Sequence, residues 1–391
     1  MKDLIKENYF NIDTPFKSKL LIIGLSHLFG FDIIKFTSAN PFNEAQAVAM
    51  KRLKKGFFEG MDWYNQSRIN RGSDPKNILT DARSIISLGI SYKTNKTLTD
   101  TNKTSLNGIV AQYAQGRDYH KVLKKRLKQL ITKIKTYFNT DLSFYLHVDD
   151  GPLIDRAIAE RSGVGWFGKN TNILNSEYGS WIFLAQIITN LNISSDQPSK
   201  KNCGTCDICM PACPTNAIIK PYVIDSRKCI SFLTIENKNE IPIEYRAAMG
   251  KRIFGCDICQ DVCPVNKNVP SSNEIKFNEK NLSILDLEAI LYMNDKEFDE
   301  KFAGTAIRRA KRIGLQRNAC VALGNTANIK ALKPLKHALS FGDTLVRQHA
   351  AWAIGNLRYK ESILILKKAL ISEKSTIVLK EIKSALEYSN K

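Results

Sequence analysis

The sequence lacks any apolar run long enough to cross a membrane, and it lacks extended low-complexity tracts. Its early apolar stretch, residues 20–25, is far shorter than the ~20 residues that a membrane-spanning helix needs. Because this stretch lies behind a charged and polar start, it does not resemble a signal peptide. We therefore expect a cytoplasmic protein without a membrane partner. Its nine cysteines should be reduced thiols, which are typical metal ligands when they cluster.

Acidic residues are also scarce relative to basic ones. The 391 residues include 58 Lys and Arg but only 38 Asp and Glu, which gives a formal net charge of +20. Residues 301–391 alone hold 18 Lys or Arg and 5 Asp or Glu. A concentrated positive field attracts polyanions, although these cations could also form an ordinary solvated helix face. We predict contacts to the phosphates of a nucleic acid from Arg308, Arg309, Lys311, Arg312 and Arg317.

Apolar periodicity divides the chain into three regions of different character. Residues 1–195 alternate between helical and strand patterns, which is typical of a layered α/β or α+β domain. The region 196–275 is rich in cysteine, and residues 276–391 are helical. Within the first region we predict helices over 20–29 and 119–137 and strands over 32–37, 84–90, 144–148 and 181–189.

The helical region contains an internal repeat. The segment Ala322-Leu323-Gly324-Asn325 recurs 31 residues later as Ala353-Ile354-Gly355-Asn356. A helix pair of this size cannot bury its apolar face alone, so stacked pairs predict a short α-solenoid of the HEAT-like type. Cys320 lies within a predicted repeat helix, where we expect a small core residue rather than a ligand.

The other eight cysteines form two spaced runs. In the first, Cys203-x2-Cys206-x2-Cys209-x3-Cys213 is followed by Pro214 and matches the pattern of bacterial ferredoxins. In that pattern three thiolates bind one 4Fe–4S cluster, and the fourth serves the other cluster. Zinc sites are the alternative, because they also take four thiolates, but a triple run ending in Cys-Pro is much rarer among them.

The second run, Cys256-x2-Cys259-x3-Cys263, lacks its first cysteine because Ile253 occupies that position. Cys229 is the remaining nearby cysteine, and we assign it the missing place. The sequence therefore predicts a ferredoxin-like module with two 4Fe–4S clusters. The predicted ligand sets are Cys203, Cys206, Cys209 and Cys263 for one cluster and Cys213, Cys229, Cys256 and Cys259 for the other.

Five long motifs make the sequence resemble the epoxyqueuosine reductases, a family of cobalamin-dependent tRNA-modifying enzymes. These motifs are residues 113–120, 148–152, 160–172, 229–236 and 304–312. The resemblance runs from about residue 20 to the C-terminus, whereas residues 1–18 have no counterpart. It implies a cobalamin-binding catalytic domain at 1–195, a module with two 4Fe–4S clusters at 196–275 and a HEAT-like tRNA-binding domain at 276–391.

The resemblance also implies an activity and its partners. Members of the family reduce epoxyqueuosine at the tRNA wobble position to queuosine, the last step of queuosine biosynthesis. The expected cofactors are cobalamin and two 4Fe–4S clusters, and the expected partners are a tRNA with a queuosine anticodon position and an external electron donor of the flavodoxin or ferredoxin type. We expect a monomer. The alternatives are a dehalogenase-like cobalamin reductase of a small molecule and a non-catalytic RNA-binding iron–sulfur protein.

Particular residues follow from the same resemblance. Asp149 aligns with the family's proton donor, although the residues alone would also allow it to cap the predicted helix 152–161. His120 and His147 are interpreted as structural, because the family leaves the lower face of cobalt without a protein ligand. Asn237 joins the predicted tRNA contacts. Predicted cofactor contacts come from Arg71, Tyr113, Asp149, Lys169, Asn170, Thr171, Ile173, Ser231, Lys238, Gly255, Cys256, Asp257 and Ile258, with Gly163, Gly165 and Gly168 allowing close approach of a flat ligand.

Overall fold

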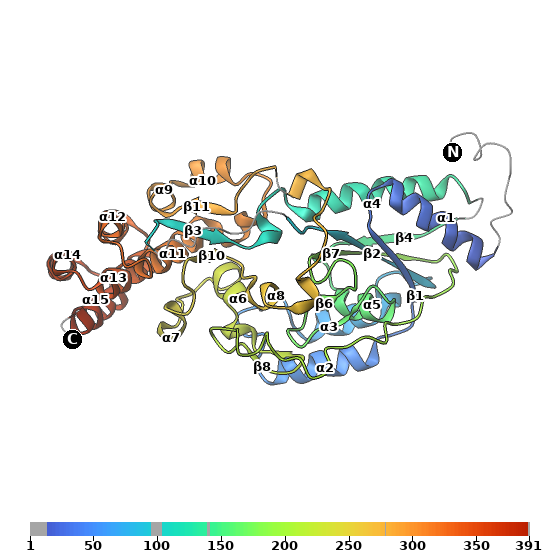
Figure 1. The fold of residues 1–391 in the computed structure, drawn as a ribbon, viewed down its shortest axis with the longest axis horizontal. Helices are drawn as coiled ribbons and strands as arrows, with labels where there is room; N and C mark the ends of the chain where they lie inside the picture. The colour runs from blue at the N-terminus through green and yellow to red at the C-terminus, as the bar shows by residue number, and fades with distance from the viewer. Residues whose placement is uncertain (1–13, 95–103, 139–140, 278, 390–391) are drawn as a thin grey trace.

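The computed structural model describes residues 14–94, 104–138, 141–277 and 279–389. Most of the leading segment 1–18 therefore lies outside the described residues. Figure 1 shows a mixed α/β part at one end of the molecule, a stack of helices at the other, and the cysteine-rich segment along one side between them. Within the described ranges, no helix combines the length and the apolar character that spanning a membrane requires.

The α/β part is built on a four-stranded antiparallel sheet. Its strands occur in the order β1 (Ile33–Ser38), β2 (Ser84–Ser91), β7 (Ile182–Thr189) and β4 (Phe144–His147). All four match strands that the sequence patterns predict. Every residue of β2 is buried, because helices cover both faces of the sheet.

Alternate side chains of the strands meet helices on opposite faces. Ile86 and Leu88 pack toward α1 (Pro15–Leu28) and α4 (Tyr119–Lys135), whereas Ile85 packs on the side of α5 (Asp155–Arg161). The predicted helices 20–29 and 119–137 thus exist, with the first beginning earlier. The same side of the sheet as α5 also carries α2 (Asn43–Lys54), α3 (Gln66–Ser73) and a short ribbon of β5 (Trp166–Phe167) and β6 (Ile173–Leu174).

A second sheet joins the three predicted regions. Its strands occur in the order β10 (Arg252–Phe254), β3 (Asn107–Val110) and β11 (Ile284–Asp286), so each strand comes from a different region. The domain limits predicted at residues 195 and 275 therefore separate segments that share backbone hydrogen bonds. Buried side chains of these strands and of the C-terminal helices belong to the same apolar core.

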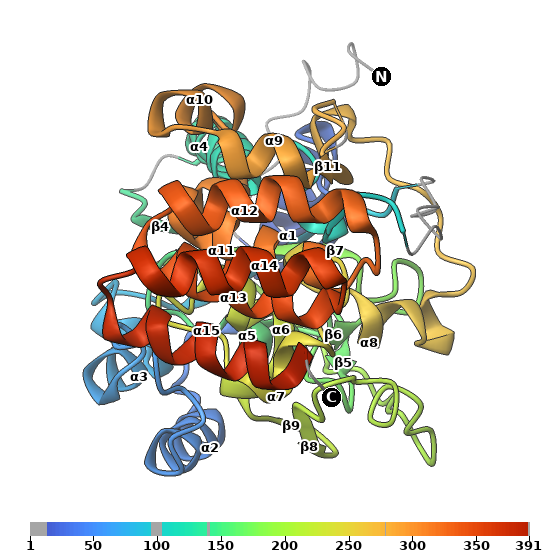
Figure 2. The same ribbon diagram turned by 90° about the vertical axis from the view of Figure 1, so that its left-hand side faces the viewer.

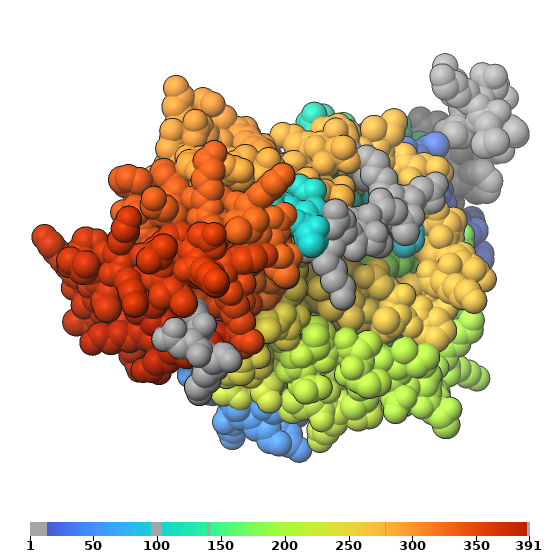
Figure 3. Space-filling view, turned by 60° about the vertical axis from the view of Figure 1, so that its left-hand side comes forward, coloured from blue at the N-terminus to red at the C-terminus, as the bar shows by residue number. Residues whose placement is uncertain are grey.

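The cysteine-rich segment has little regular structure. Its elements are β8 (Ile218–Lys220), β9 (Val223–Ile224), α6 (Ile230–Ile235), α7 (Ile243–Arg246) and α8 (Ile258–Asp261). Its surface adjoins that of the C-terminal helices on the face in Figure 3, where the module is yellow-green and the helices are orange to red.

The C-terminal region is a stack of helices, as the repeat predicts. Figure 2 shows its later members lying in rows. The helices are α9 (Leu287–Tyr292), α10 (Asp295–Lys301), α11 (Lys311–Gly324), α12 (Leu332–Phe341), α13 (Thr344–Leu357), α14 (Lys360–Ser372) and α15 (Thr376–Ser389).

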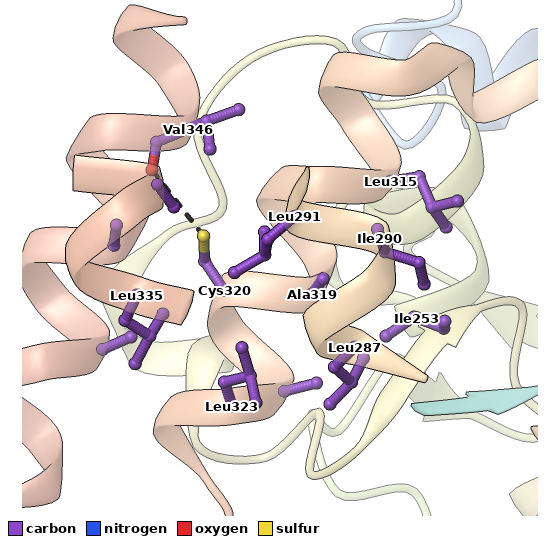
Figure 4. Close-up of a cluster of buried hydrophobic side chains, with 14 of the residues drawn as sticks. Ile253, Leu287, Ile290, Leu291, Leu315, Ala319, Cys320, Leu323, Leu335 and Val346 are labelled. Atoms are coloured by element: carbon purple, nitrogen blue, oxygen red, sulfur yellow. Dashed lines mark hydrogen bonds between the residues drawn. The ribbon is translucent and has the colours of Figure 1, made fainter. Parts of the chain in front are cut away.

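The repeated glycines explain how closely these helices pack. A Cβ atom on Gly324 would lie 2.9 Å from Cα of Ala353, and one on Gly355 would lie 2.7 Å from Cβ of Ala385. Each glycine therefore gives the next repeat room to approach. Cys320 is fully buried among leucine and isoleucine side chains, with its Sγ 3.8 Å from the Val346 carbonyl, so its predicted core role is confirmed (Figure 4).

Candidate active site and cluster module

A cavity of about 1240 Å³ opens beside the four-stranded sheet. Pockets for drug-sized ligands are typically ~300–1,000 Å³, so this cavity suits a larger ligand. Helices α2 and α5 form much of its wall, α3 contributes Arg68, and Asp149 and Tyr119 are among the lining residues. Other lining residues used below are Trp63, Arg68, Arg156, Thr171 and Tyr222.

Asp149 follows β4 in a backbone conformation with φ +54°, which is uncommon for a residue other than glycine. The Tyr119 hydroxyl donates a hydrogen bond of 2.6 Å to Asp149 Oδ2. The Asp149 side chain is exposed at the cavity, and dense protein lies around it. Burial in these surroundings, followed by the charge of Asp155, raises the pKa of Asp149. Burial likewise keeps the Tyr119 pKa well above its usual value, so this phenol remains a donor.

The two carboxylates nearest to Asp149 in this part of the chain, Asp150 and Asp155, each have a partner of their own. Asp150 forms an ion pair with Lys124 at the surface. Helix α5 begins after Ile154 and has no side-chain cap, so the alternative that Asp149 caps this helix is wrong. His147 Nε2 lies 3.1 Å from Asp155 Oδ2, and His120 is bonded to Asp118, which agrees with the structural roles predicted for both histidines.

Arg68 is a site residue that the sequence analysis missed. Its guanidinium donates to the carbonyl of Gly151, two residues after Asp149, and lines the cavity. Arg71, which was predicted to contact the cofactor, is exposed one turn later in α3 and is not among the lining residues. Because both arginines lie in α3 about one turn apart, the sequence alone does not show which of them faces the cavity.

The segment from Lys169 to Ile173 connects the catalytic part to the cysteine module. The Asn170 side chain donates to the Cys259 carbonyl over 3.2 Å, and the Lys169 carbonyl accepts from Tyr222 N over 3.0 Å. Thr171 has φ +70° and accepts from Arg156 through its carbonyl and its hydroxyl, while Ile173 is buried in β6. Within the 169–173 segment, Thr171 and Asn172 line the cavity.

The three glycines near this segment have a different role from the one predicted. A Cβ atom would lie 2.3 Å from the Gln197 carbonyl at Gly163 and 2.2 Å from the Leu174 carbonyl at Gly165. At Gly168 it would lie 2.6 Å from the side chain of Asn170. The chain itself fills the space that these glycines leave, so they serve internal packing and not the approach of a ligand.

The first group of thiols is gathered from both cysteine runs. Burial, followed by its neighbours Cys263, Cys203 and Cys206, raises the pKa of Cys209 to about 11. Burial also raises the pKa of Cys263, and the neighbouring thiols of Cys203 and Cys206 raise it further. Cys206 is exposed, so this group lies at the surface of the module.

The second group lies deeper in the protein. Burial is the main cause that raises the pKa of Cys256 to about 12, and Cys229 adds to it. The pKa of Cys259 is raised well above its usual value by burial and then by Cys229 and Cys256, while Cys213 is a neighbour of Cys229. These neighbours agree with the predicted ligand sets, and Cys209 of the first set is also an electrostatic neighbour of Cys259. The assignment of the eight thiols to two clusters stays a prediction. Among the residues described, no three His, Cys, Asp or Glu side chains approach closely enough to hold a single metal ion.

The deeper group adjoins the catalytic part through the segment from Gly255 to Ile258, where α8 begins. Gly255 has φ +72°, and a Cβ atom there would lie 2.6 Å from Ala111. Asp257 is buried and accepts from Gln112 N over 2.7 Å. Tyr113 packs between the two parts, with its ring 6.3 Å from Tyr119 and 6.1 Å from Phe254. Ser231 lies in α6 beside the Cys229 thiol.

The cations predicted to bind RNA lie in different environments. Arg308 and Arg309 are exposed and pair with Asp299 and Glu236, and Lys311 is also exposed. Arg312 is half-buried between Asp295 and Asp343.

The environment of Arg317 contradicts the prediction that this residue binds RNA. It is fully buried, and burial lowers its pKa to about 9. Its guanidinium donates to the carbonyls of Leu233, Asn237 and Asn239, so it holds the turn after α6. The Asn237 side chain is bonded within the same turn, and the Lys238 ammonium donates to the carbonyls of Ile235 and Arg309.

Comparison with known families defines the class of protein first. A family model described as "4Fe-4S double cluster binding domain" matches residues 202–266, and one described as "HEAT repeats" matches residues 303–387. The chain is therefore an iron–sulfur protein with two 4Fe–4S clusters and a HEAT-repeat region, and the zinc alternative is not supported.

Further comparisons identify the family. A model described as "Epoxyqueuosine reductase QueG, DUF1730" matches residues 73–149. The chain is 35% identical to the epoxyqueuosine reductase of Escherichia coli (strain K12) over 83% of this chain and 86% of the relative, and 34% identical to that of Bacillus anthracis over 94% and 96%. A crystal structure of epoxyqueuosine reductase with an epoxyqueuosine-modified tRNA-Tyr stem loop superimposes with a TM-score of 0.90 at 32% identity, covering 97% of this chain and 100% of that one. The chain belongs to the epoxyqueuosine reductase family.

Proposed function

We propose that this chain reduces epoxyqueuosine at the wobble position of tRNA to queuosine, as the last step of queuosine biosynthesis. Family membership supports this activity, and a solved relative at 32% identity binds an epoxyqueuosine-modified stem loop. The single observation that carries the proposal is Asp149, an acid with a raised pKa that lies in the large cavity beside the cluster module.

The overall reaction consumes two electrons and two protons. Both C–O bonds of the epoxide break, an alkene forms in the cyclopentane ring, and the oxygen leaves as water. A departing alkoxide needs a proton donor within hydrogen-bond reach. Because its pKa is raised, Asp149 retains a proton nearer to neutral pH than an ordinary aspartic acid does. Tyr119 fixes the orientation of this carboxyl through its hydrogen bond to Oδ2.

The cavity fits a ligand of the size and character of cobalamin. Its volume exceeds that of drug-sized pockets, and its wall combines apolar side chains such as Phe42 and Leu153 with polar ones such as Thr171. When bound, cobalamin would supply a reducible and strongly nucleophilic cobalt centre. Of the residues proposed to hold it, Thr171 lines this cavity, and Arg68 does so in the place predicted for Arg71. Tyr113, the rest of the 169–173 segment except Asn172, and the Gly255–Ile258 segment are not among the lining residues, and with Ser231 and Lys238 they remain predictions.

The positions of the two thiol groups suggest the order in which electrons pass. Cys203, Cys206, Cys209 and Cys263 would hold the cluster nearer the surface, because Cys206 is exposed. Cys213, Cys229, Cys256 and Cys259 would hold the inner cluster, which adjoins the catalytic part at Asn170. We infer that an external donor of the flavodoxin or ferredoxin type reduces the outer cluster, and that a cytoplasmic monomer carries out the reaction.

The exposed cations of the HEAT-repeat region are proposed to bind the phosphates of the tRNA. Arg308, Arg309 and Lys311 are accessible, whereas Arg312 is shared between two carboxylates and would contribute less. Phosphate contacts position an RNA without reading its sequence. Selectivity would then come from the modified base entering the cavity.

The test is anaerobic reconstitution with iron, sulfide and cobalamin, followed by mass analysis of the nucleosides of treated tRNA. We expect queuosine to replace epoxyqueuosine in reactions that contain a reductant. Omitting cobalamin should abolish conversion while the visible absorption of the clusters stays. Conversion of an aryl halide but not of modified tRNA would instead favour the dehalogenase-like alternative. Tight RNA binding without any corrinoid binding would favour the non-catalytic alternative.

A further inference from the structure

Trp63 presents a partly exposed indole ring at the rim of the cavity. The side chain is 43% exposed and lines the opening. The guanidinium of Arg68 lies 4.7 Å from the centre of the ring, and that of Arg309 lies 5.9 Å from it. Arg309 belongs to the C-terminal region, so the ring lies where the catalytic and HEAT-repeat regions meet.

The loop that carries Trp63, residues 55–64, is fixed to the cysteine module. Ser226 N donates to the Phe57 carbonyl over 3.2 Å, and Arg227 pairs with Glu59 at the same distance. Gly60 has φ +83°, and a Cβ atom there would lie 2.8 Å from the ring of Phe232. The indole is thus held in place before any ligand arrives, which lowers the entropic cost of binding.

Both arginines connect the indole to the catalytic turn. Arg68 donates to the carbonyl of Gly151, two residues after Asp149. Arg309 is bonded to Glu236, and its pKa is raised by that bond and also by the charge of Asp149, which places the guanidinium within electrostatic reach of the acid. Trp63 and Asp149 line the same cavity, so a ligand on the indole would share that cavity with the acid.

This combination of groups indicates an unpaired nucleotide. Proteins bind single-stranded RNA by stacking bases on aromatic rings or guanidinium planes and by placing cations against the backbone. We propose that Trp63 is a stacking platform for an unpaired anticodon-loop base that neighbours the reacting nucleotide, with Arg309 contacting the adjacent phosphate. This inference rests on the proposed function for the identity of the RNA.

The alternative is that Trp63 only packs over Arg68 and shields it from water. Substitution of Trp63 would then alter stability without altering RNA binding. The two roles can be separated by replacing the ring with another ring and with an aliphatic side chain of similar apolar character. The reconstituted protein carrying its clusters is the sample in each case.

The experiment measures binding of a fluorescein-labelled anticodon stem–loop RNA by anisotropy. W63L should weaken binding roughly tenfold, because an aliphatic side chain cannot stack on a base, whereas W63F should stay within roughly threefold of the unchanged protein. Tyr388 in α15 supplies a matched control. Its side chain is 46% exposed, and the guanidinium of Arg358 lies 4.3 Å from the centre of its ring. Y388L should leave RNA binding unchanged. Equal affinities for W63L and the unchanged protein would overturn the proposal.

A second measurement identifies the base. Each loop nucleotide is replaced in turn by an abasic one, and each RNA is titrated against both W63L and the unchanged protein. At one position the two losses should not add, because both changes remove the same contact. Additive losses at every position would contradict stacking. These titrations use unmodified RNA, so failure of epoxyqueuosine conversion would count against the proposed function alone.

Discussion

The hydroxyl of Tyr119 and the carboxylate of Asp149 are joined by a hydrogen bond of 2.6 Å across two elements, the first turn of α4 and the turn after β4. The bond favours the ionised carboxylate, whereas burial and Asp155 favour the protonated acid, with burial the largest effect. The pKa of Asp149 is therefore set by opposing effects, and the Tyr119 hydroxyl supplies one of those that lower it.

Replacing Tyr119 by Phe should move the pH dependence of kcat to higher pH. Loss of the hydrogen bond removes a group that lowers the Asp149 pKa, so the acid would stay protonated to higher pH than in the unchanged protein. The descending limb of the profile should shift to higher pH by about one to two units, since a hydrogen bond to a charged group is worth ~1.5–3 kcal/mol. Single-turnover rates on modified stem–loop RNA between pH 6 and 9 would measure this; an unchanged or downward-shifted limb would contradict the assignment of Asp149 as the acid.

Replacing Asp149 by Asn should remove the proton donor while keeping its size and polarity. We expect kcat to fall by roughly 10²–10⁴-fold, the range typical of general acids, with little change in RNA affinity. Asp150→Asn is the matched control, because Asp150 pairs with Lys124 at the surface and should be nearly silent. If both variants lost activity equally, the neighbouring carboxylate would have to share the role.

Arg309 and Arg317 should respond in opposite ways to replacement by Ala. Arg309 is exposed, so R309A should weaken RNA binding and reduce the slope of log Kd against log salt by about one phosphate contact. Arg317 is buried with several carbonyl partners, so R317A should lower the melting temperature by several degrees. Salt titrations and calorimetry on both variants would measure these effects. Weaker RNA binding by R317A without any loss of stability would contradict the prediction.

Two glycines of α11 offer a test of the repeat packing. Gly324→Ala should cost about 1–3 kcal/mol, because the new methyl group would lie 2.9 Å from Ala353 and Trp352. Gly314→Ala should be tolerated or slightly stabilising, since its Cβ would have only Ala310 at 3.8 Å. Denaturant unfolding of both variants measures the contrast, and equal stabilities would show that the helices can shift apart without cost.

Local patterns predicted much of the fold. The strands β2 and β7 and the helix α4 follow from apolar periodicity, whereas the assignment of thiols to each cluster stays a prediction from cysteine spacing. Asp149 depended on the family resemblance, because nothing in its immediate sequence distinguishes a proton donor from a helix cap.

Contacts between distant segments set the limits of that prediction. Arg317 resembles a surface cation in a basic run, yet it meets carbonyls about 80 residues earlier in the chain. Arg68 and Arg71 differ by one turn of α3, and only the position of Gly151 identifies Arg68 as the residue that faces the cavity. Trp63 carried no signal, because its two cationic neighbours are brought together by the packing of separate regions.

The small sheet of β10, β3 and β11 has a consequence for synthesis on the ribosome. Strand β3 leaves the exit tunnel early but has no partner until Arg252–Phe254 emerges, and its other edge stays unpaired until Ile284–Asp286 follows. All eight clustered cysteines are translated before that last strand. The nascent polypeptide therefore displays its thiols to the assembly machinery of the cell while the platform that will join the three regions is still incomplete.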